Sequence, residues 1–176
     1  MWINLSILRI CKEQPPQGWW FTRISETLSA DISGDVTLSH TPIQVRSATV
    51  GSTILEKIDP SSTYLFSGSA SPLAFYVEGN KLKIIPPAPL GTIVKVVYDR
   101  KLPDLVNDSD ENELTVFAPE VVVSGALVDV SLHLGRVEDS KVWEERFQRG
   151  LDELRRLNLR RREAYLGDVL SDARPS

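Results

Sequence analysis

The chain has 176 residues, of which 41% are hydrophobic and 25% are charged, and its formal net charge is -4. This composition is typical of a soluble globular protein with one domain or two small ones, and it excludes wholesale disorder and a membrane-protein composition. Because Cys11 is the single cysteine, and His40 and His133 are the only histidines, an intramolecular disulfide and an ordinary Cys/His zinc site are also excluded. We expect no cofactor and no structural metal.

The first residues, MWINLSILRIC, form a short apolar run that no basic residue precedes and no small-residue cleavage motif follows. This pattern does not predict a secretory signal. No other segment approaches the roughly 20 apolar residues of a membrane-spanning helix. We therefore expect no membrane association and a protein made in a reducing cytosol, either kept there or assembled into something larger.

Residues 1–35 hold three of the four tryptophans, Trp2, Trp19 and Trp20, on both sides of the proline pair in EQPPQG. The prolines prevent a continuous helix, so we expect a short helix or strand before them and interpret WWFTRISETLSADISG as a second short helix that ends near Gly34. Large exposed aromatic side chains are favoured anchors for a partner. The three tryptophans are candidate docking residues of an N-terminal docking segment, and packing onto their own domain is the open alternative.

The pattern of residues 36–103 predicts a β-domain. VTLSHTPIQVRSATV and STILEKID are rich in β-branched residues, and LAFYVEGNKLKIIPP has two apolar runs around Gly79 and Asn80, a pair suited to the positive φ of a hairpin turn. In GTIVKVVYD, alternate residues from Thr92 to Tyr98 share one face of a strand. We expect an antiparallel meander, a small sandwich or an open barrel.

An acidic connector, RKLPDLVNDSDENE, follows the β-domain. Its acidic residues suit either a calcium loop or a solvated linker, and the linker is favoured because the spacing of an EF-hand loop is absent. The carboxylates of the connector are those of Asp104, Asp108, Asp110, Glu111 and Glu113.

Residues 104–176 predict a helical hairpin with a C-terminal tail, which completes an α+β fold. Pro119 suits a first helical turn, and Gly125 and Ala126 provide a face where a second backbone can approach closely. A second helix is expected from near Ser140. The predicted apolar stripes are Val123, Leu127, Val130, Leu134 and Val137 on the first helix and Trp143, Phe147, Leu151 and Leu154 on the second.

The second helix runs into LDELRRLNLRRREAYLG, where five arginines occur with no acid among them. At about 100° per residue, Arg161 falls on the apolar stripe itself, so either the helix ends near Asn158 or it outruns its own core. Three interpretations remain open: a solvated helix end, a site for nucleic-acid phosphates, and a surface that binds an acidic protein partner. The candidate partner-binding residues are Arg155, Arg156, Arg160, Arg161 and Arg162.

The sequence holds no phosphate-binding glycine loop and no G-x-S-x-G elbow. Asp129 and His133 are four residues apart on the first predicted helix, and we interpret them as a polar pair at a helix interface instead of part of a catalytic triad. No catalytic residue is assigned, so we do not expect an enzyme.

Three stretches together resemble the head-to-tail adaptor proteins of tailed bacteriophages, in particular those of short-tailed phages. The stretches are FYVEGNKLKIIPPAP, IVKVVYDRKLPDL and NELTVFAPEVVVSGALVDVSLHLGRVEDSKVWEERFQRGLDELRR. The resemblance covers about residues 60–157, and its motifs are structural. The positions that match the family pattern are Tyr98, Leu102, Pro103, Leu105, Asn112, Leu114 and Pro119.

The resemblance implies a virion protein of the neck that is assembled in the host cytoplasm. Its copies would form a ring, expected to be a dodecamer, between the portal protein and a tail or nozzle protein, and the ring would surround the channel for packaged DNA. The arginine cluster would then contact the portal or the DNA. The alternatives are a small oligomeric protein-interaction module and a nucleic-acid-binding protein, and the acidic net charge argues against the second.

Overall fold

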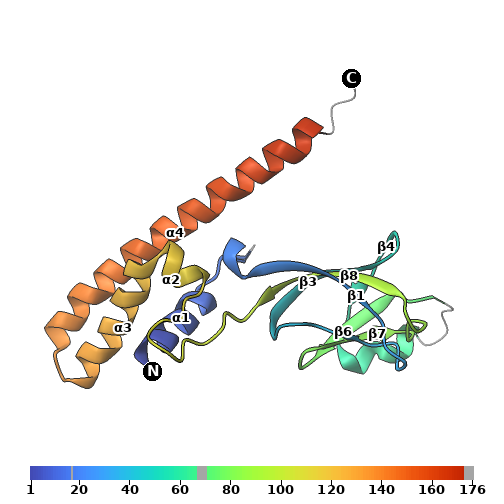
Figure 1. Ribbon diagram of the computed structural model, residues 1–176, viewed down its shortest axis with the longest axis horizontal. Coiled ribbons are helices and arrows are strands. Elements are labelled where there is room, and N and C mark those ends of the chain that lie inside the picture. The colour runs from blue at the N-terminus through green and yellow to red at the C-terminus, as the bar shows by residue number, and fades with distance from the viewer. Residues whose placement is uncertain (17, 67–70, 173–176) are drawn as a thin grey trace. The chain divides into compact units, whose positions relative to one another are not determined.

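The computed structural model describes residues 1–16, 18–66 and 71–172, and for residues 162–172 it describes the backbone without the side chains. Helices and two four-stranded sheets make up the chain (Figure 1). The α+β class predicted from the sequence is therefore confirmed, and the sheets do not close into a barrel.

The chain forms two compact units, each with its own hydrophobic core. Thr22–Lys101 forms one unit, which we call the β unit. Met1–Phe21 and Leu102–Ser176 together form the other, the helical unit. The N-terminal residues thus share a core with the helices that end the chain.

The β unit contains two sheets. The first has the strand order β1 (Arg23–Ser29), β8 (Ile93–Arg100), β3 (Pro42–Val50) and β4 (Thr53–Ile54), and the second has β2 (Val36–Thr37), β7 (Lys81–Ile85), β6 (Ala74–Glu78) and β5 (Glu56–Lys57). The pairings are antiparallel except that of β5 with β6, which is parallel. Of the three predicted forms, the meander is not the one observed, because a parallel pair requires a crossover. The 3-10 helix Pro60–Phe66 lies between these two strands.

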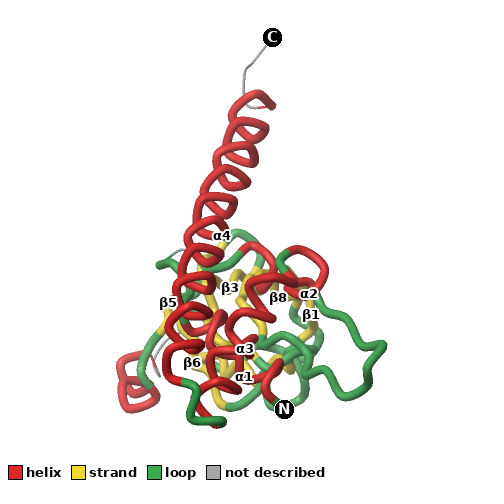
Figure 2. The backbone as a smooth tube through the Cα atoms, turned by 90° about the vertical axis from the view of Figure 1, so that its left-hand side faces the viewer, coloured by secondary structure: helices red, strands yellow, loops and turns green. Residues whose placement is uncertain are grey.

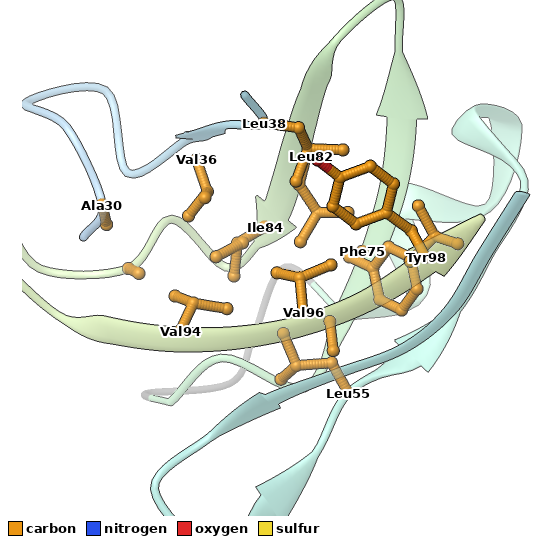
Figure 3. Packing of buried hydrophobic residues seen from close by; sticks show 13 residues of the cluster. Ala30, Val36, Leu38, Leu55, Phe75, Leu82, Ile84, Val94, Val96 and Tyr98 are labelled. Carbon is orange, nitrogen blue, oxygen red and sulfur yellow. The ribbon is translucent and has the colours of Figure 1, made fainter. Parts of the chain in front are cut away.

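One core fills the space between the two sheets (Figure 3). Val94, Val96 and Tyr98 of β8 point into it, as the alternation in GTIVKVVYD predicts, and Leu82 and Ile84 of β7 enter from the other sheet. The β unit is therefore a small sandwich, which is one of the three predicted forms.

β1 corrects the helix expected in WWFTRISETLSADISG. Arg23–Ser29 is a strand that pairs with β8 along its whole length, and its side chains alternate between exposed and partly buried positions. The segment has the period of two of a strand, with Ile24 and Leu28 turned to the core. The segment is a strand because it pairs with β8. The propensities of its own residues do not reveal this pairing, since β8 lies far away in the sequence.

The hairpin of β6 and β7 forms as predicted, with Glu78 opposite Lys81. Gly79 has a φ of 62°, whereas Asn80 does not have a positive φ. One positive φ at the first central position is the pattern of a type II′ turn, so only the glycine is required by the backbone here.

A buried carboxylate lies on β8 beside the core residues. Asp99 is fully buried, and its Oδ1 accepts a hydrogen bond from Arg23 Nε at 3.2 Å and its Oδ2 from Arg46 Nε at 2.7 Å. The register of β3 with β8 shifts between Val45 and Ser47, so Arg46 occupies a bulge. Two guanidinium groups compensate the cost of burying this charge.

The helical unit consists of α1 (Trp2–Lys12), α2 (Glu113–Phe117), α3 (Pro119–His133) and α4 (Val137–Asp172) (Figures 1 and 2). α3 begins at Pro119, as predicted. α4 begins earlier than Ser140, because Gly135, with a φ of 70°, ends the preceding helical segment and allows a tight connection.

The small residues of α3 face the interior of the unit. Ser6 of α1 donates a hydrogen bond to the carbonyl of Val122 at 2.8 Å, and a Cβ added at Gly125 would lie 2.9 Å from the ring of Phe147 and in collision with the Ser6 hydroxyl. The close approach predicted for Gly125 is thus made by α1 and α4. The core residues of the unit are Ile7, Ile10, Cys11, Trp19, Phe21, Leu102, Leu114, Val121, Val122, Phe147, Leu151 and Leu154.

The apolar stripe predicted to be the buried face of α3 is wrong. Val123 is 47% exposed and Leu134 is 59% exposed, and Val137 belongs to the start of α4. The sequence holds two apolar faces on this helix, and α1 and α4 cover the one with the smaller side chains because it permits a closer approach. On α4 the predicted face is confirmed at Phe147 and Leu151, which are fully buried.

An ion pair connects α1 to α4. Arg9 Nη2 lies 2.7 Å from Oε1 and 3.0 Å from Oε2 of Glu144, and the guanidinium lies 4.4 Å from the centre of the Phe147 ring. Burial by itself raises the pKa of Glu144, but hydrogen bonds from Gln148 and Arg9 and the charge of Arg9 outweigh it. The pKa of this carboxyl therefore lies below its usual value.

We predict that Gly125→Ala destabilises the protein by about 1–3 kcal/mol, because the added methyl group overpacks the contact with Ser6 and Phe147. Alanine at an open helical position would instead stabilise the chain slightly. Urea unfolding measures the change. Combining Gly125→Ala with Ser6→Ala should cost less than the sum of the two single variants, and an additive or stabilising result would contradict the contact.

A second prediction concerns acid stability. Because the pKa of Glu144 is lower in the folded state, its contribution is present above the unfolded pKa and is lost as the pH falls through the folded value. The free energy of unfolding of Glu144→Gln should therefore decline less than that of the parent between about pH 6 and about pH 3. Glu145→Gln, an exposed neighbour, is the control and should follow the parent.

Candidate partner-binding surface on helix α4

α4 is longer than the core that it packs against. Among its described side chains, Asn158 is the last buried one, yet the helix continues to Asp172. This continuation adds about 20 Å of helix at the usual rise per residue. Figures 1 and 2 show α4 running past α1, α2 and α3. Of the two alternatives drawn from the sequence, the helix that outruns its core is the one observed.

Asn158 fastens the N-terminal segment to α4 at the place where the core ends. Its Nδ2 donates to the carbonyl of Gly18 at 3.0 Å, and its Oδ1 accepts from the backbone N–H of Trp20 at 3.0 Å. The side chain thus holds both ends of a short backbone segment that would otherwise leave polar groups unpaired against the helix.

The three candidate docking tryptophans have different surroundings. Trp19 is fully buried, and its Nε1 donates to the carbonyl of Ile10 at 2.9 Å, so it is a core residue with no surface for a partner. Trp2 is partly buried, with its ring centre 5.5 Å from that of His133. Trp20 is also partly buried and lies edge-on to Phe117 at 6.2 Å.

Arg161 occupies the position where the apolar stripe of α4 leaves the core. Its guanidinium lies 5.0 Å from the ring centre of Trp20 and 5.3 Å from that of Phe117. A cation over aromatic faces is worth about 0.5–1 kcal/mol at an exposed site. An arginine on the apolar stripe is therefore accommodated by two rings of its own chain.

The rest of the arginine cluster divides into held and free side chains. Arg155 donates to Asp152 at 3.0 Å and to Glu13 at 3.3 Å. Arg156 and Arg160 are exposed and form no hydrogen bond or ion pair with any residue in the described part of the chain. The side chain of Arg162 lies outside the described residues. Arg156 and Arg160 are thus exposed to solvent, whereas Arg155 and Arg161 bind side chains of the same chain and help to hold α4 in place.

The other polar residues considered from the sequence are His133 with Asp129 and the carboxylates of the connector. His133 is exposed and forms no hydrogen bond with Asp129 among the described residues, so the predicted polar pair is wrong: the ring turns to Trp2 instead. In the connector, Asp110 accepts hydrogen bonds from the backbone of Asn107 and Val106, which lower its pKa. Within residues 1–16, 18–66 and 71–161, no group of three or more His, Cys, Asp or Glu side chains is placed to hold a metal ion.

A second surface was not predicted from the sequence. An open groove of about 570 Å³ lies between α3 and α4, with Val123, Trp143, Arg146 and Glu153 among its lining residues. The guanidinium of Arg146 lies 4.7 Å from the Trp143 ring centre. The sequence feature that could have indicated this groove is the apolar stripe of α3, to which Val123 belongs. We predicted that this stripe would be buried inside the protein.

These features give a packed helical unit whose long helix α4 presents a cluster of arginines. The family model of the SU10 adaptor protein matches residues 1–171, so the chain belongs to the SU10 adaptor protein family, a family of phage structural proteins that connect head and tail. No curated protein sequence matches the chain. None of the described helices is both long enough and apolar enough to cross a bilayer.

We predict that Asn158→Leu destabilises the protein by about 1–3 kcal/mol, because it leaves the Gly18 carbonyl and the Trp20 N–H without their partner. Thermal and urea unfolding measure the loss. Arg156→Gln, two positions away on the exposed side of α4, is the control and should unfold like the parent. Equal stabilities of the two variants would contradict the role of Asn158.

Proposed function

We propose that this adaptor forms a ring in the virion neck, between the portal and the tail components, and that the exposed arginines of α4 bind the portal. The ring surrounds the channel through which the DNA passes. The role is structural and not catalytic. Family membership supports the position between head and tail, and the observation that carries the binding site is the exposure of Arg156 and Arg160 on a helix that outruns its core.

The way α4 is held favours docking to a rigid partner. Asn158 and Arg161 fix the helix against the N-terminal segment at the point where it leaves the core. A helix that is already ordered loses less conformational entropy on binding than a mobile tail does. Arg156 and Arg160 then act as preorganised donors for carboxylates, which guanidinium groups bind in two-pronged geometry.

An acidic protein surface is a better partner for these arginines than DNA. The chain as a whole carries a net charge of -4, which opposes binding to a polyanion over a large area. A pair of exposed guanidinium groups supplies specificity and a fast encounter where the partner offers matching carboxylates. The β unit provides a separate surface for lateral contacts or for tail proteins.

We predict that Arg156→Gln with Arg160→Gln weakens the complex with purified portal about tenfold or more, which corresponds to about 1.4 kcal/mol. Sedimentation or native mass spectrometry of the mixture measures the complex. The control is Arg136→Gln with Lys95→Gln, which changes the net charge equally at two exposed positions away from this part of α4.

The outcomes separate the alternatives. Loss of portal binding in the α4 variant alone supports the proposal, and equal binding by both variants contradicts it. If the α4 variant instead loses salt-dependent affinity for duplex DNA while portal binding is kept, the arginines contact the nucleic acid.

A further inference from the structure

The outer face of α3 is apolar along its length and is only partly covered by its own chain: Val123 and Leu134 are exposed, and Leu127 and Val130 are partly buried. These four residues recur at helical spacing on the side opposite the buried residues of α3, and the groove between α3 and α4 borders this face at Val123. A helix that is apolar all round is usually buried all round. The inner face of α3 is covered within the unit, so the outer face lacks its partner.

α1 has the same character. Its inner face carries Ser6, Ile7 and Ile10, which are buried, and its outer face carries Leu5 and Leu8, which are 43% and 40% exposed. Lys12 continues this outer face at the end of the helix, and Arg9, which pairs with Glu144, lies at its border beside Leu5. The helical unit therefore offers two separate apolar stripes, one on α1 and one on α3.

We propose that the two stripes bind each other between copies: the outer face of α1 of one copy packs on the outer face of α3, and on the adjoining groove, of the next copy. This inference rests on the proposed function, since it names the contact that builds the ring. A contact between two different faces is head-to-tail, and such contacts close into rings when the rotation permits.

Charge favours this pairing over a parallel contact between two α1 helices. The groove beside the α3 stripe is lined by Glu120 and Glu153, whose carboxylates have no hydrogen-bond or ion-pair partner among the described residues, as well as by Arg146 and Arg149. Lys12 of a neighbouring copy meets these carboxylates at the rim. Pairing α1 with α1 in parallel would instead bring two lysines together.

The two stripes differ in extent. At the usual helical rise, the stripe from Val123 to Leu134 extends about 16 Å and the outer face of α1 from Leu5 to Lys12 extends about 10 Å. The α1 face therefore fits within the α3 stripe, and its apolar side chains can be covered along their whole length.

Complementary variants test the contact in the full chain. Leu5→Asp with Leu8→Asp disables the α1 face, and Val123→Asp with Leu134→Asp disables the α3 face. Ile54→Asp, an exposed position on β4, is the matched control. Circular dichroism and thermal unfolding establish that each variant folds like the parent, and analytical ultracentrifugation measures the assembly of each protein.

The parent and the Ile54→Asp control should self-associate, and each double variant alone should be a monomer. A mixture of the two double variants retains one intact pair of faces, so it should form a one-to-one dimer and no larger species. A parent that remains monomeric at the highest concentration it reaches, or a double variant that still self-associates, would overturn the proposal. If the mixture stays monomeric, the two faces do not bind each other, and the proposal is also overturned.

A charge reversal adds an independent readout. Lys12→Glu should weaken self-association, and combining it with Glu153→Lys should restore it. The Arg156→Gln and Arg160→Gln variant should still self-associate, so loss of portal binding in that variant with intact assembly bears on the proposed function alone. If the double charge reversal does not restore self-association, Lys12 of one copy does not lie beside Glu153 of the next, and the proposed alignment of the two faces is contradicted.

Discussion

The close approach of α1 to Gly125 of α3 determines which surfaces the helical unit buries and which it presents. A glycine at this position lets the Ser6 hydroxyl and the Phe147 ring contact the backbone of α3 from two sides. The small residues of α3 therefore turn inward together with Val121, Val122 and Val128, whereas Val123 and Leu134 remain exposed. A larger side chain at Gly125 would separate the helices and remove the reason for that orientation.

The same core determines where α4 becomes available to another molecule. Phe147 and Leu151 hold α4 in the core, and Asn158 ends the buried part by binding the backbone of residues 18–20. Beyond this point the helix depends on its own hydrogen bonds and on the rings that receive Arg161. A helix that is fixed at one end in this manner and presents exposed arginines fits an adaptor that contacts another protein.

The sequence predicted those features that depend on local periodicity. The β6–β7 hairpin, the inward face of β8, the start of α3 at Pro119 and the buried face of α4 all follow from patterns within one segment. The strand β1 and the orientation of α3 could not be predicted in this way, because each depends on a segment distant in the sequence. The division of the arginines into held and exposed side chains likewise depends on Glu13, Trp20 and Phe117, which lie far from α4 in the chain.

The central claim is that the exposed part of α4 lies against the portal while neighbouring copies meet through their helical units. A cryo-electron microscopy map of the portal with this adaptor bound would test it most directly. The account predicts a closed ring of adaptors in which Arg156 and Arg160 of each copy contact portal carboxylates. A ring that contacts the portal through its β units, with α4 turned away from the portal, would contradict it.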